Sequence, residues 1–253
     1  MSELLLECKD LSFSYHTPEG EIPVIHNMNF KIYKGEFVSI VGPSGCGKST
    51  LLNLLTGMLK SEEGSVRLSC NSDEKSHYGY MLQQDHLFEW YDLWKNICIG
   101  PEINHCLTPE LEAYLKELLQ RYGLSAFIHK KPSELSGGMR QRAAIIRTLA
   151  MKPELLYLDE PFSSLDYQNR LNAANDIGQI IRNEDKTAVL VTHDIGEAIS
   201  LSSRVLVLSS RPTTVKKEFV LPYRSRNLTP LEIRNTKDFG TYFNAIWKEL
   251  NEA

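Results

Sequence analysis

A glycine-rich segment ending in Lys-Ser-Thr has the residue types needed to hold the phosphate groups of a nucleotide. It reads Gly42-Pro43-Ser44-Gly45-Cys46-Gly47-Lys48-Ser49-Thr50 and completes the GxxxxGK[ST] pattern of a phosphate loop. Glycines let backbone N–H groups turn inward around phosphate oxygens, Lys48 would reach the terminal phosphates, and Ser49 would supply a hydroxyl to Mg²⁺. The apolar run 37–41 and the helical pattern 49–59 flank the segment as strand and helix, which disfavours a chance glycine turn.

Two adjacent carboxylates follow an apolar run later in the chain. Leu155-Leu156-Tyr157-Leu158 predicts a buried strand, and Asp159 and Glu160 come directly after it. Ligands of α/β sheets gather at the carboxyl ends of strands, so Asp159 is expected to hold Mg²⁺ through water and Glu160 to polarise an attacking water as general base. Taken alone, such an acidic strand end often only caps the next turn.

A second candidate anion site is the turn Ser136-Gly137-Gly138. It precedes the helical pattern 139–150 and therefore offers a helix N-terminus with bare N–H groups and a serine hydroxyl. One phosphate loop does not need a second such end. By itself the turn is equally well read as a simple helix start.

One cysteine lies inside the phosphate loop. Because Cys46 is close to the predicted N-terminus of a helix, its thiolate is expected to be favoured, and bound ATP is expected to protect it from alkylation.

The three motifs, in this order, resemble the ATP-binding subunit of an ABC transporter. The segment Leu135-Ser136-Gly137-Gly138-Met139-Arg140-Gln141-Arg142 lies between the two halves of the nucleotide site without belonging to either. The resemblance implies that Ser136, Gly137 and Gly138 bind the γ-phosphate of ATP held by a second copy. Two copies would then close head to tail around two nucleotides.

Four shorter matches occur at their expected places in the same order. The resemblance implies that Tyr15 stacks on adenine, that Gln83 contacts Mg²⁺ and the attacking water, that the loop 163–166 with Asp166 crosses the dimer interface, and that His193 contacts the γ-phosphate. Each has a plainer interpretation: Tyr15 as a core aromatic, Gln83 as a strand end, Asp166 as a helix cap and His193 as a hydrogen-bonded residue at a strand end.

The resemblance spans roughly residues 4–221 and is strongest toward importer subunits of the nitrate, sulfonate and taurine type. The segment 83–90 supports that branch, although Glu89 stands where proline is usual and Tyr157 interrupts an aliphatic strand. Ile146 and Thr148 also replace common alanines. The resemblance implies ATP and Mg²⁺ as cofactors, a second ATP-binding subunit, separate transmembrane permease subunits and, indirectly, an extracytoplasmic solute-binding protein.

Composition is consistent with such a subunit. The 253 residues are 42% hydrophobic and carry a net charge of -4 without long runs of like charge, so a nucleic-acid partner is not expected. No apolar run approaches the roughly 20 residues that cross a bilayer, and no signal sequence is recognised. Five cysteines without a CxxC pair favour a reducing compartment. We therefore expect a peripheral location at the cytoplasmic face of the membrane, through the permease.

The alternation of short apolar runs with helical patterns predicts an α/β fold of the P-loop NTPase type. Turn signals before residue 66 predict an antiparallel N-terminal part, and the expected sheet is mixed. Predicted strands are 4–9, 12–15, 28–32, 37–41, 66–69, 78–82, 155–158, 188–192, 205–209 and 215–221.

The chain is expected to be a single domain, 1–253, with a helical subdomain at about 84–150. Thr108 and Gly123 predict the start and stop of one of its helices. A helical tail at about 228–253 is expected to pack on the core, with partner binding as the alternative.

Aromatic residues are concentrated at 84–100, and this segment is the expected docking surface for the permease. The alternative is a small private core made by the residues Phe88, Trp90, Tyr91, Leu93 and Trp94. An exporter subunit or a soluble ABC ATPase outside transport are the alternative functions.

Overall fold

The computed structural model describes residues 3–69, 78–223 and 228–252. Its N-terminal part is an antiparallel three-stranded sheet in the order β2-β1-β4, as the turn signals predict. Gly20, with φ +133°, turns the chain between the first two strands. The strands are β1 (Leu4–Thr17), β2 (Gly20–Tyr33) and β4 (Glu63–Leu68).

A six-stranded sheet in the order β5-β6-β7-β3-β8-β9 forms the centre of the molecule. All neighbouring pairs are parallel except β8 and β9, so the sheet is mixed and the predicted fold class is confirmed. Its strands are β3 (Phe37–Val41), β5 (Tyr78–Met81), β6 (Leu155–Asp159), β7 (Thr187–Val191), β8 (Arg204–Leu208) and β9 (Val215–Val220).

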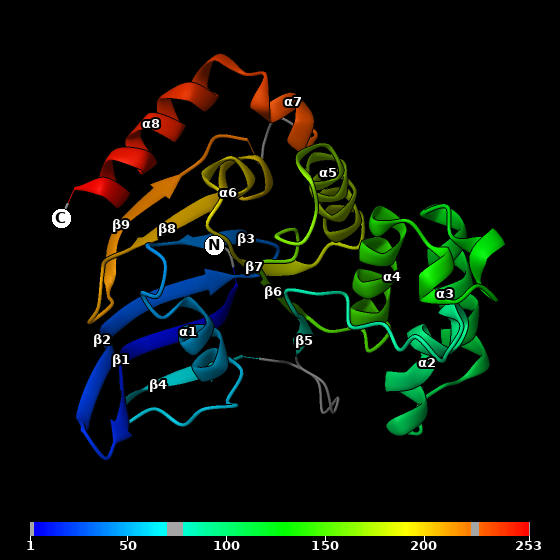
Figure 1. Cartoon of the computed structure of the whole chain (residues 1–253), viewed down its shortest axis with the longest axis horizontal. Helices are drawn as coiled ribbons and strands as arrows, with labels where there is room; N and C mark the ends of the chain where they lie inside the picture. Colours follow the sequence, from blue (N-terminus) through cyan, green and yellow to red (C-terminus); the bar gives the residue numbers. More distant parts are fainter. Residues whose placement is uncertain (1–2, 70–77, 224–227, 253) are drawn as a thin grey trace.

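Helices cover this sheet and extend beyond one edge. The sequence 84–150 runs between β5 and β6 and is mainly helical, and Figure 1 shows α2, α3 and α4 gathered on the side away from β1, β2 and β4. The helices are α1 (Lys48–Leu55), α2 (Leu93–Ile103), α3 (Pro109–Arg121), α4 (Gly137–Leu149), α5 (Tyr167–Asn183), α6 (Ile195–Leu201), α7 (Pro230–Arg234) and α8 (Lys237–Asn251), with short 3-10 turns η1 (Ser125–Phe127) and η2 (Pro132–Glu134).

Several predicted boundaries differ from the structure. The strand expected at 28–32 begins at Gly20, and the strand expected at 66–69 begins at Glu63. Two further differences have identifiable reasons. The runs 4–9 and 12–15 form one strand, because Asp10 adopts φ +51° and a bulge lets the pairing with β2 continue past it. The helix expected at 49–59 ends at Leu55, since Gly57 follows in a left-handed conformation with φ +74°. Thr108 caps α3 by accepting a hydrogen bond from the Leu111 amide, as expected.

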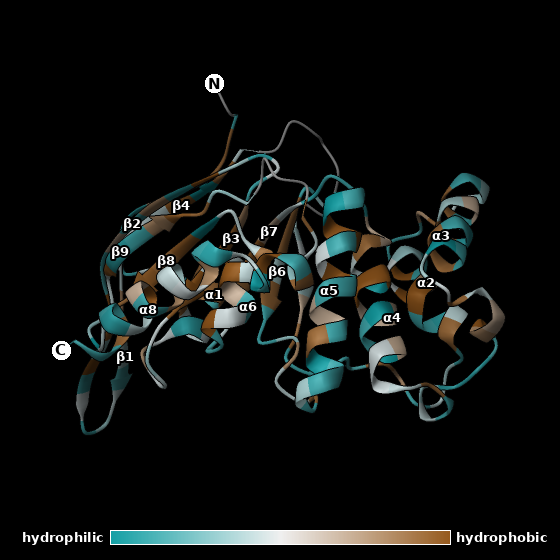
Figure 2. Cartoon of the chain, turned by 90° about the horizontal axis from the view of Figure 1, so that it is seen from above, coloured by the Kyte–Doolittle hydropathy of each residue, from teal (hydrophilic) through white to brown (hydrophobic). Residues whose placement is uncertain are grey.

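The buried residues join these elements through the two faces of the central sheet. One cluster links α2, α3, α4 and α5 to β6 and β7, and a second links the N-terminal sheet and α1 to β3. In Figure 2, α4 and α5 carry both hydrophilic and hydrophobic colours, which is typical of helices with one face on a core. The unusual Tyr157 is fully buried, and its hydroxyl donates to the Leu55 carbonyl at 3.3 Å, which satisfies the added polar group.

The C-terminal helix packs on the core, as predicted. It contacts α6 and β8 and buries Ile246 completely, while the exposed fraction of Trp247 is 57%. Phe239, Phe243 and Trp247 form a stacked row along it. Over the described ranges, the chain has no helix with the length and apolar character of a membrane span.

Candidate functional site

The phosphate loop connects β3 to α1 and depends on its glycines. Gly45 and Gly47 have φ of +73° and +115°, which side chains of L-residues rarely adopt. A Cβ on Gly42 would lie 2.9 Å from Cys46 Sγ and 3.0 Å from Leu208 Cβ, and one on Gly47 would lie 2.6 Å from a methyl group of Val24. The loop is therefore closely packed against Val24, Cys46 and Leu208, while Ser44 and Gly45 are exposed.

The ammonium group of Lys48 and the N-terminus of α1 place positive charge at this loop. Lys48 begins α1, is only 8% exposed, and donates to the carbonyl oxygens of Gly42 at 2.9 Å and Pro43 at 3.0 Å. No side chain caps the N-terminus of α1, so the amides of its first turn are free to bind an anion together with the ammonium group. The neighbouring Ser44 is exposed. The hydroxyls of Thr50 and Tyr15 share a hydrogen bond of 3.3 Å.

The prediction for Cys46 is wrong. Its side chain is 2% exposed, and burial raises the pKa of the thiol more than the charge of Lys48 lowers it. Its carbonyl accepts a hydrogen bond from Thr213. Cys46 supports the loop from inside and is not a reactive thiolate.

Asp159 ends β6 beside α1. It accepts hydrogen bonds from the hydroxyls of Tyr80, at 3.2 Å, and Ser49. Burial raises the pKa of this carboxyl and the charge of Glu160 adds to the rise, while the hydrogen bond from Tyr80 and the charge of Lys48 oppose it. Oxygen ligands from a hydroxyl and a carboxylate are the kind that Mg²⁺ prefers, so Ser49 and Asp159 fit the ion. The described residues contain no cluster of three or more His, Cys, Asp or Glu side chains with metal-ligating geometry, so other ligands would have to come from water and phosphate.

Glu160 and His193 are brought into contact from two neighbouring strands. Glu160 Oε2 lies 2.9 Å from His193 Nδ1, and the Glu160 amide donates to the Val191 carbonyl at 2.8 Å. Glu160 adopts φ +44°, a conformation uncommon for residues with a side chain. This turn directs a carboxylate and an imidazole into the same space beyond the carboxyl ends of β6 and β7.

Tyr15 and Gln83 border this region without meeting Glu160. Tyr15 is 41% exposed, and its ring packs in an edge-to-face arrangement with Phe13. Gln83 is exposed and lies two residues after β5, the neighbour of β6. The segment after Gln83 is tied to α4, because Arg140 donates to Asp85 at 2.8 and 3.1 Å.

The turn Ser136-Gly137-Gly138 starts α4, and no contact in the described parts of the chain joins it to the phosphate loop. Ser136 caps the helix by accepting from the Met139 amide at 3.4 Å, and Ser136 and Gly137 are exposed. Gly138 has no atom near its Cβ position, whereas a Cβ on Gly137 would lie 3.1 Å from Leu165. The two predicted anion sites therefore fall at two separate helix N-termini, those of α1 and α4.

Asp166 caps α5 by accepting from the Asn169 amide at 3.1 Å. Hydrogen bonds from Asn169 hold the pKa of its carboxyl below the usual range. The capping interpretation of Asp166 is therefore correct within one copy, and its exposed position in the loop 163–166 leaves room for an additional contact.

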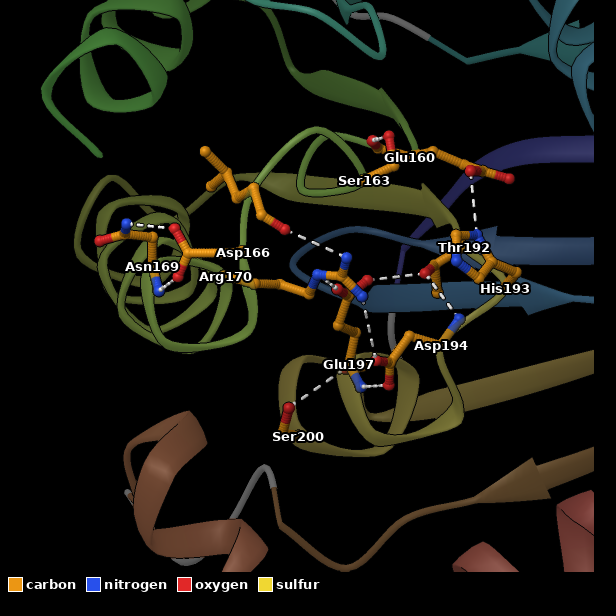
Figure 3. Close-up of polar contacts among 11 residues, drawn as sticks. Glu160, Ser163, Asp166, Asn169, Arg170, Thr192, His193, Asp194, Glu197 and Ser200 are labelled. Atoms are coloured by element: carbon orange, nitrogen blue, oxygen red, sulfur yellow. Dashed lines mark hydrogen bonds and ion pairs between the residues drawn. The ribbon is translucent and has the colours of Figure 1, made fainter. Parts of the chain in front are cut away.

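Sequence reasoning missed four residues that surround the site. Tyr80 holds Asp159, and a network of Arg170, Thr192 and Glu197 supports the turn that carries His193 (Figure 3). Burial raises the pKa of Glu197 to about 7, despite a hydrogen bond from Thr192. The spacing of Thr192 and Glu197 around His193 was available in the sequence, but only the fold shows that Arg170 lies opposite them.

Comparison with known proteins agrees with this geometry. The family model described as "ABC transporter" matches residues 25–163. An uncharacterised ABC transporter ATP-binding protein of Bacillus subtilis, YtlC, is 43% identical over 97% of this chain and 95% of its own length. The taurine import ATP-binding protein TauB of Ruegeria pomeroyi is 34% identical over 94% of this chain and 89% of its own.

A solved structure shares the fold. The ATP-binding cassette MJ0796, in a dimeric post-hydrolysis state bound to ADP and Pi, superposes with a TM-score of 0.70 at 31% identity, covering 86% of this chain and 99% of that one. These findings confirm the resemblance on which the expected fold and activity rest. The chain belongs to the ABC transporter family and is an ATPase of that family.

Proposed function

We propose that two copies of this chain close around two molecules of Mg-ATP, and that hydrolysis drives solute import through separate permease subunits. One observation carries the proposal. The phosphate loop with Asp159, Glu160 and His193 forms one half of a site, while Ser136-Gly137-Gly138 forms a second anion-binding end elsewhere on the same chain. Head-to-tail pairing joins these halves without any change within the chain.

In this proposal the chain's residues bind and orient the triphosphate. The backbone amides of residues 42–50 and the ammonium of Lys48 hold the phosphates, and Tyr15 stacks on the base. Ser49, Asp159 and Gln83 are the residues that would hold Mg²⁺, which neutralises phosphate charge when bound.

Glu160 is placed to accept a proton from the attacking water, and His193 to orient that carboxylate through their 2.9 Å contact and to face the γ-phosphate. Ser136, Gly137 and Gly138 of the second copy complete the site, with Asp166 at the interface. Because phosphoryl transfer depends mainly on positioning and charge stabilisation, a site that is complete only after closure hydrolyses little ATP when open.

The permease is proposed to dock on the helical subdomain at 84–150, within the single domain 1–253. Trp90 is 68% exposed and stands beside Phe88 and Tyr91, whereas Leu93 is fully buried and Trp94 packs on the core. Each interpretation therefore applies to part of the cluster. Residues 88–91 form the proposed docking surface, and residues 93–94 anchor it to the core.

Import rather than export is proposed because one relative is named a taurine importer and covers most of the chain. An extracytoplasmic solute-binding protein would then deliver an anionic solute to the permease. The chain would lie at the cytoplasmic face of the membrane, held there by the permease and without a nucleic-acid partner.

The test of the hydrolytic site is Glu160→Gln. The amide keeps the side-chain size but cannot accept the proton, so turnover is expected to fall by about 10²–10⁴-fold while ATP binding stays near wild type. Steady-state ATPase assays and equilibrium ATP binding measure both, and light scattering with Mg-ATP measures dimer formation. Wild-type turnover in this variant would refute Glu160 as the base, and a monomer saturated with Mg-ATP would refute the closed pair.

The transport part is tested separately on the complex. A tagged chain purified from detergent-solubilised membranes is expected to carry its permease, and the solute-loaded binding protein is expected to stimulate its ATPase activity. Charge introduced by Trp90→Glu should weaken co-purification, whereas Trp247→Glu, at another tryptophan that is more than half exposed and lies on α8, serves as control. Equal co-purification of both variants would remove the docking surface from the proposal.

A further inference from the structure

The side chain of Arg170 joins the loop 163–166 to the turn that carries His193, and the proposed mechanism of ATP hydrolysis gives it no role. Arg170 lies in the first turn of α5, and Figure 3 shows its side chain directed toward Asp194 and Glu197. Its Nη2 donates to the Leu165 carbonyl at 3.2 Å. Its Nη1 lies 3.9 Å from Asp194 Oδ2, and its Nε lies 4.0 Å from Glu197 Oε1.

At one end of this Arg170 bridge, Asp194 and Glu197 support the turn that carries His193. Glu197 is 3% exposed, and its carboxylate accepts from the Thr192 hydroxyl at 2.6 Å. The same hydroxyl accepts from the Asp194 amide at 3.0 Å, and Asp194 caps α6 by accepting from the Glu197 amide. The residues on both sides of His193 are thus fixed, and the imidazole, which is itself more than half exposed, is held at Glu160 mainly by its backbone.

At the other end of the Arg170 bridge, Leu165 lies beside the Ser136-Gly137-Gly138 turn. Leu165, whose carbonyl Arg170 holds, is the residue that a Cβ on Gly137 would meet at 3.1 Å. The loop 163–166 is therefore linked to the His193 turn through the Arg170 side chain, and the Ser136-Gly137-Gly138 turn is linked to it through the side chains of Leu165 and Arg170. Arg170 also lines the groove that contains Gly42, Pro43 and His193.

Charge supports this arrangement. Two carboxylates, Asp194 and Glu197, face one guanidinium, and Arg170 is 25% exposed, so the group is partly shielded from water. Its Nε is buried without a hydrogen-bond partner, and the contacts to both carboxylates are longer than a hydrogen bond.

We propose that Arg170 is a positioning residue for His193, acting by tying the Leu165 carbonyl to the carboxylates of Asp194 and Glu197. The inference rests on the proposed function, in which His193 orients Glu160. It assigns to Arg170 no contact with ATP.

The test compares Arg170→Met, Arg170→Lys and the control Arg182→Met. Arg182 lies on the same helix and likewise donates to a carbonyl, that of Leu228, away from the site. We expect kcat to fall about 10- to 100-fold in Arg170→Met with KM for ATP changed less than about threefold, because a positioning group acts on the reacting arrangement and not on ground-state binding. Arg170→Lys should recover most of the loss and Arg182→Met should match wild type. Wild-type kcat in Arg170→Met overturns the inference.

A double-mutant comparison separates positioning from general support. If Arg170 acts through His193, then Arg170→Met should lower kcat by less than about twofold when added to His193→Ala. A full further loss in the double variant would show that Arg170 acts independently of His193 and would overturn the inference.

Removing Arg170 leaves the buried Glu197 carboxylate without a cation, so the variant can lose stability for that reason alone. The variant Arg170→Met/Glu197→Gln removes this charge as well and still lacks the link to Leu165, so it should fold and keep the loss in kcat. Recovery of wild-type kcat would mean that Arg170 only neutralises Glu197.

A measurement without nucleotide keeps the inference separate from the proposed function. The ring nitrogen signals of His193, assigned by their loss in His193→Ala, should shift in Arg170→Met and return in Arg170→Lys. Unchanged signals overturn the inference even if the wild-type chain is an active ATPase. An inactive wild-type complex would instead overturn the proposed function, while the signal shift would still support Arg170.

Discussion

At the scale of single residues, burial decides which groups are reactive. Cys46 stands in a sequence context that favours a thiolate, yet the fold encloses it behind the phosphate loop. Glu197 is a buried carboxyl and Asp159 a partly buried one, both with raised pKa, while the exposed Asp166 has a lowered pKa. Sequence position alone does not distinguish these environments, because desolvation depends on what packs around each group.

Alkylation measures the environment of Cys46. We expect iodoacetamide at pH 8 to modify Cys46 about tenfold or more slowly than the exposed Cys106, because burial limits access and disfavours the thiolate. Peptide mapping by mass spectrometry reads each thiol separately. Since the native protein already hides Cys46, ATP should change its rate little, and fast labelling that ATP suppresses would restore the original prediction.

Glu197 makes stability depend on pH in a defined window. Its pKa rises from a usual value of 4.5 to about 7 on folding, chiefly through burial, so below pH 4.5 both states are protonated and no penalty exists. Between 4.5 and 7 the native state keeps a proton that the unfolded state releases, so ionisation increasingly disfavours folding as pH rises. The penalty is constant above 7.

Glu197→Gln should remove this dependence. Relative to wild type, its free energy of unfolding should increase from pH 4.5 to 7 by at most about 3 kcal/mol, since one pKa unit corresponds to about 1.4 kcal/mol. Urea denaturation at several pH values measures the difference, with Glu117→Gln on the surface of α3 as control. A difference that stays flat or falls with pH would contradict the burial of this carboxyl.

At the scale of elements, left-handed glycines fix where strands and helices meet. Gly64 in β4 has φ +76°, and a Cβ there would lie 2.3 Å from the Asp10 carbonyl oxygen at the bulge of β1. Gly57 after α1 has nearly the same φ, +74°, but no atom within 4 Å of its Cβ position. The two glycines therefore have the same left-handed backbone conformation and differ only in whether a Cβ atom would have room.

This pair gives a matched test of the β1–β4 junction. Gly57→Ala should lower the free energy of unfolding by about 1 kcal/mol, the typical strain of a left-handed alanine. Gly64→Ala adds a clash with backbone that cannot move aside, so its loss should be several times larger. Thermal or urea unfolding measures both variants. Equal losses would show that the bulge at Asp10 accommodates the methyl group.

At the scale of the whole molecule, the proposed function assigns two half-sites to one chain, each completed by a second copy. If pairing is head to tail, a copy with Lys48→Ala and a copy with Ser136→Arg should each be inactive alone. In a mixed pair, the intact phosphate loop of the Ser136→Arg copy meets the intact Ser136 turn of the Lys48→Ala copy. One of its two sites is then complete.

Co-expression of the two variants with different tags tests this directly. Random pairing makes half of the dimers mixed, so turnover should return to about one quarter of wild type, and dimers isolated through both tags should show about one half. Each variant expressed alone is the control. Mixed dimers without turnover would mean that the two half-sites do not complement each other between copies.

The sequence alone determined the class of the fold and the positions of the phosphate loop and of the helix start at Ser136. Apolar runs predict β6 and β7, and the pattern 42–50 predicts the strand, turn and helix around Lys48, because these features depend on local periodicity and on glycine conformations. The cap at Thr108 and the end of the chain in an amphipathic helix followed from the same local rules. The roles proposed for Glu160, His193, Gln83 and Ser136 remain predictions.

Only the tertiary structure decided which of these groups meet. The contact between Glu160 and His193 joins residues 33 positions apart on neighbouring strands, and the bridge through Arg170 joins a helix to a turn on another element. The continuity of β1 past Asp10 depended on pairing with β2, and the protection of Cys46 depended on the packing behind the loop. Such features arise from long-range packing and desolvation, which no local pattern of residues encodes.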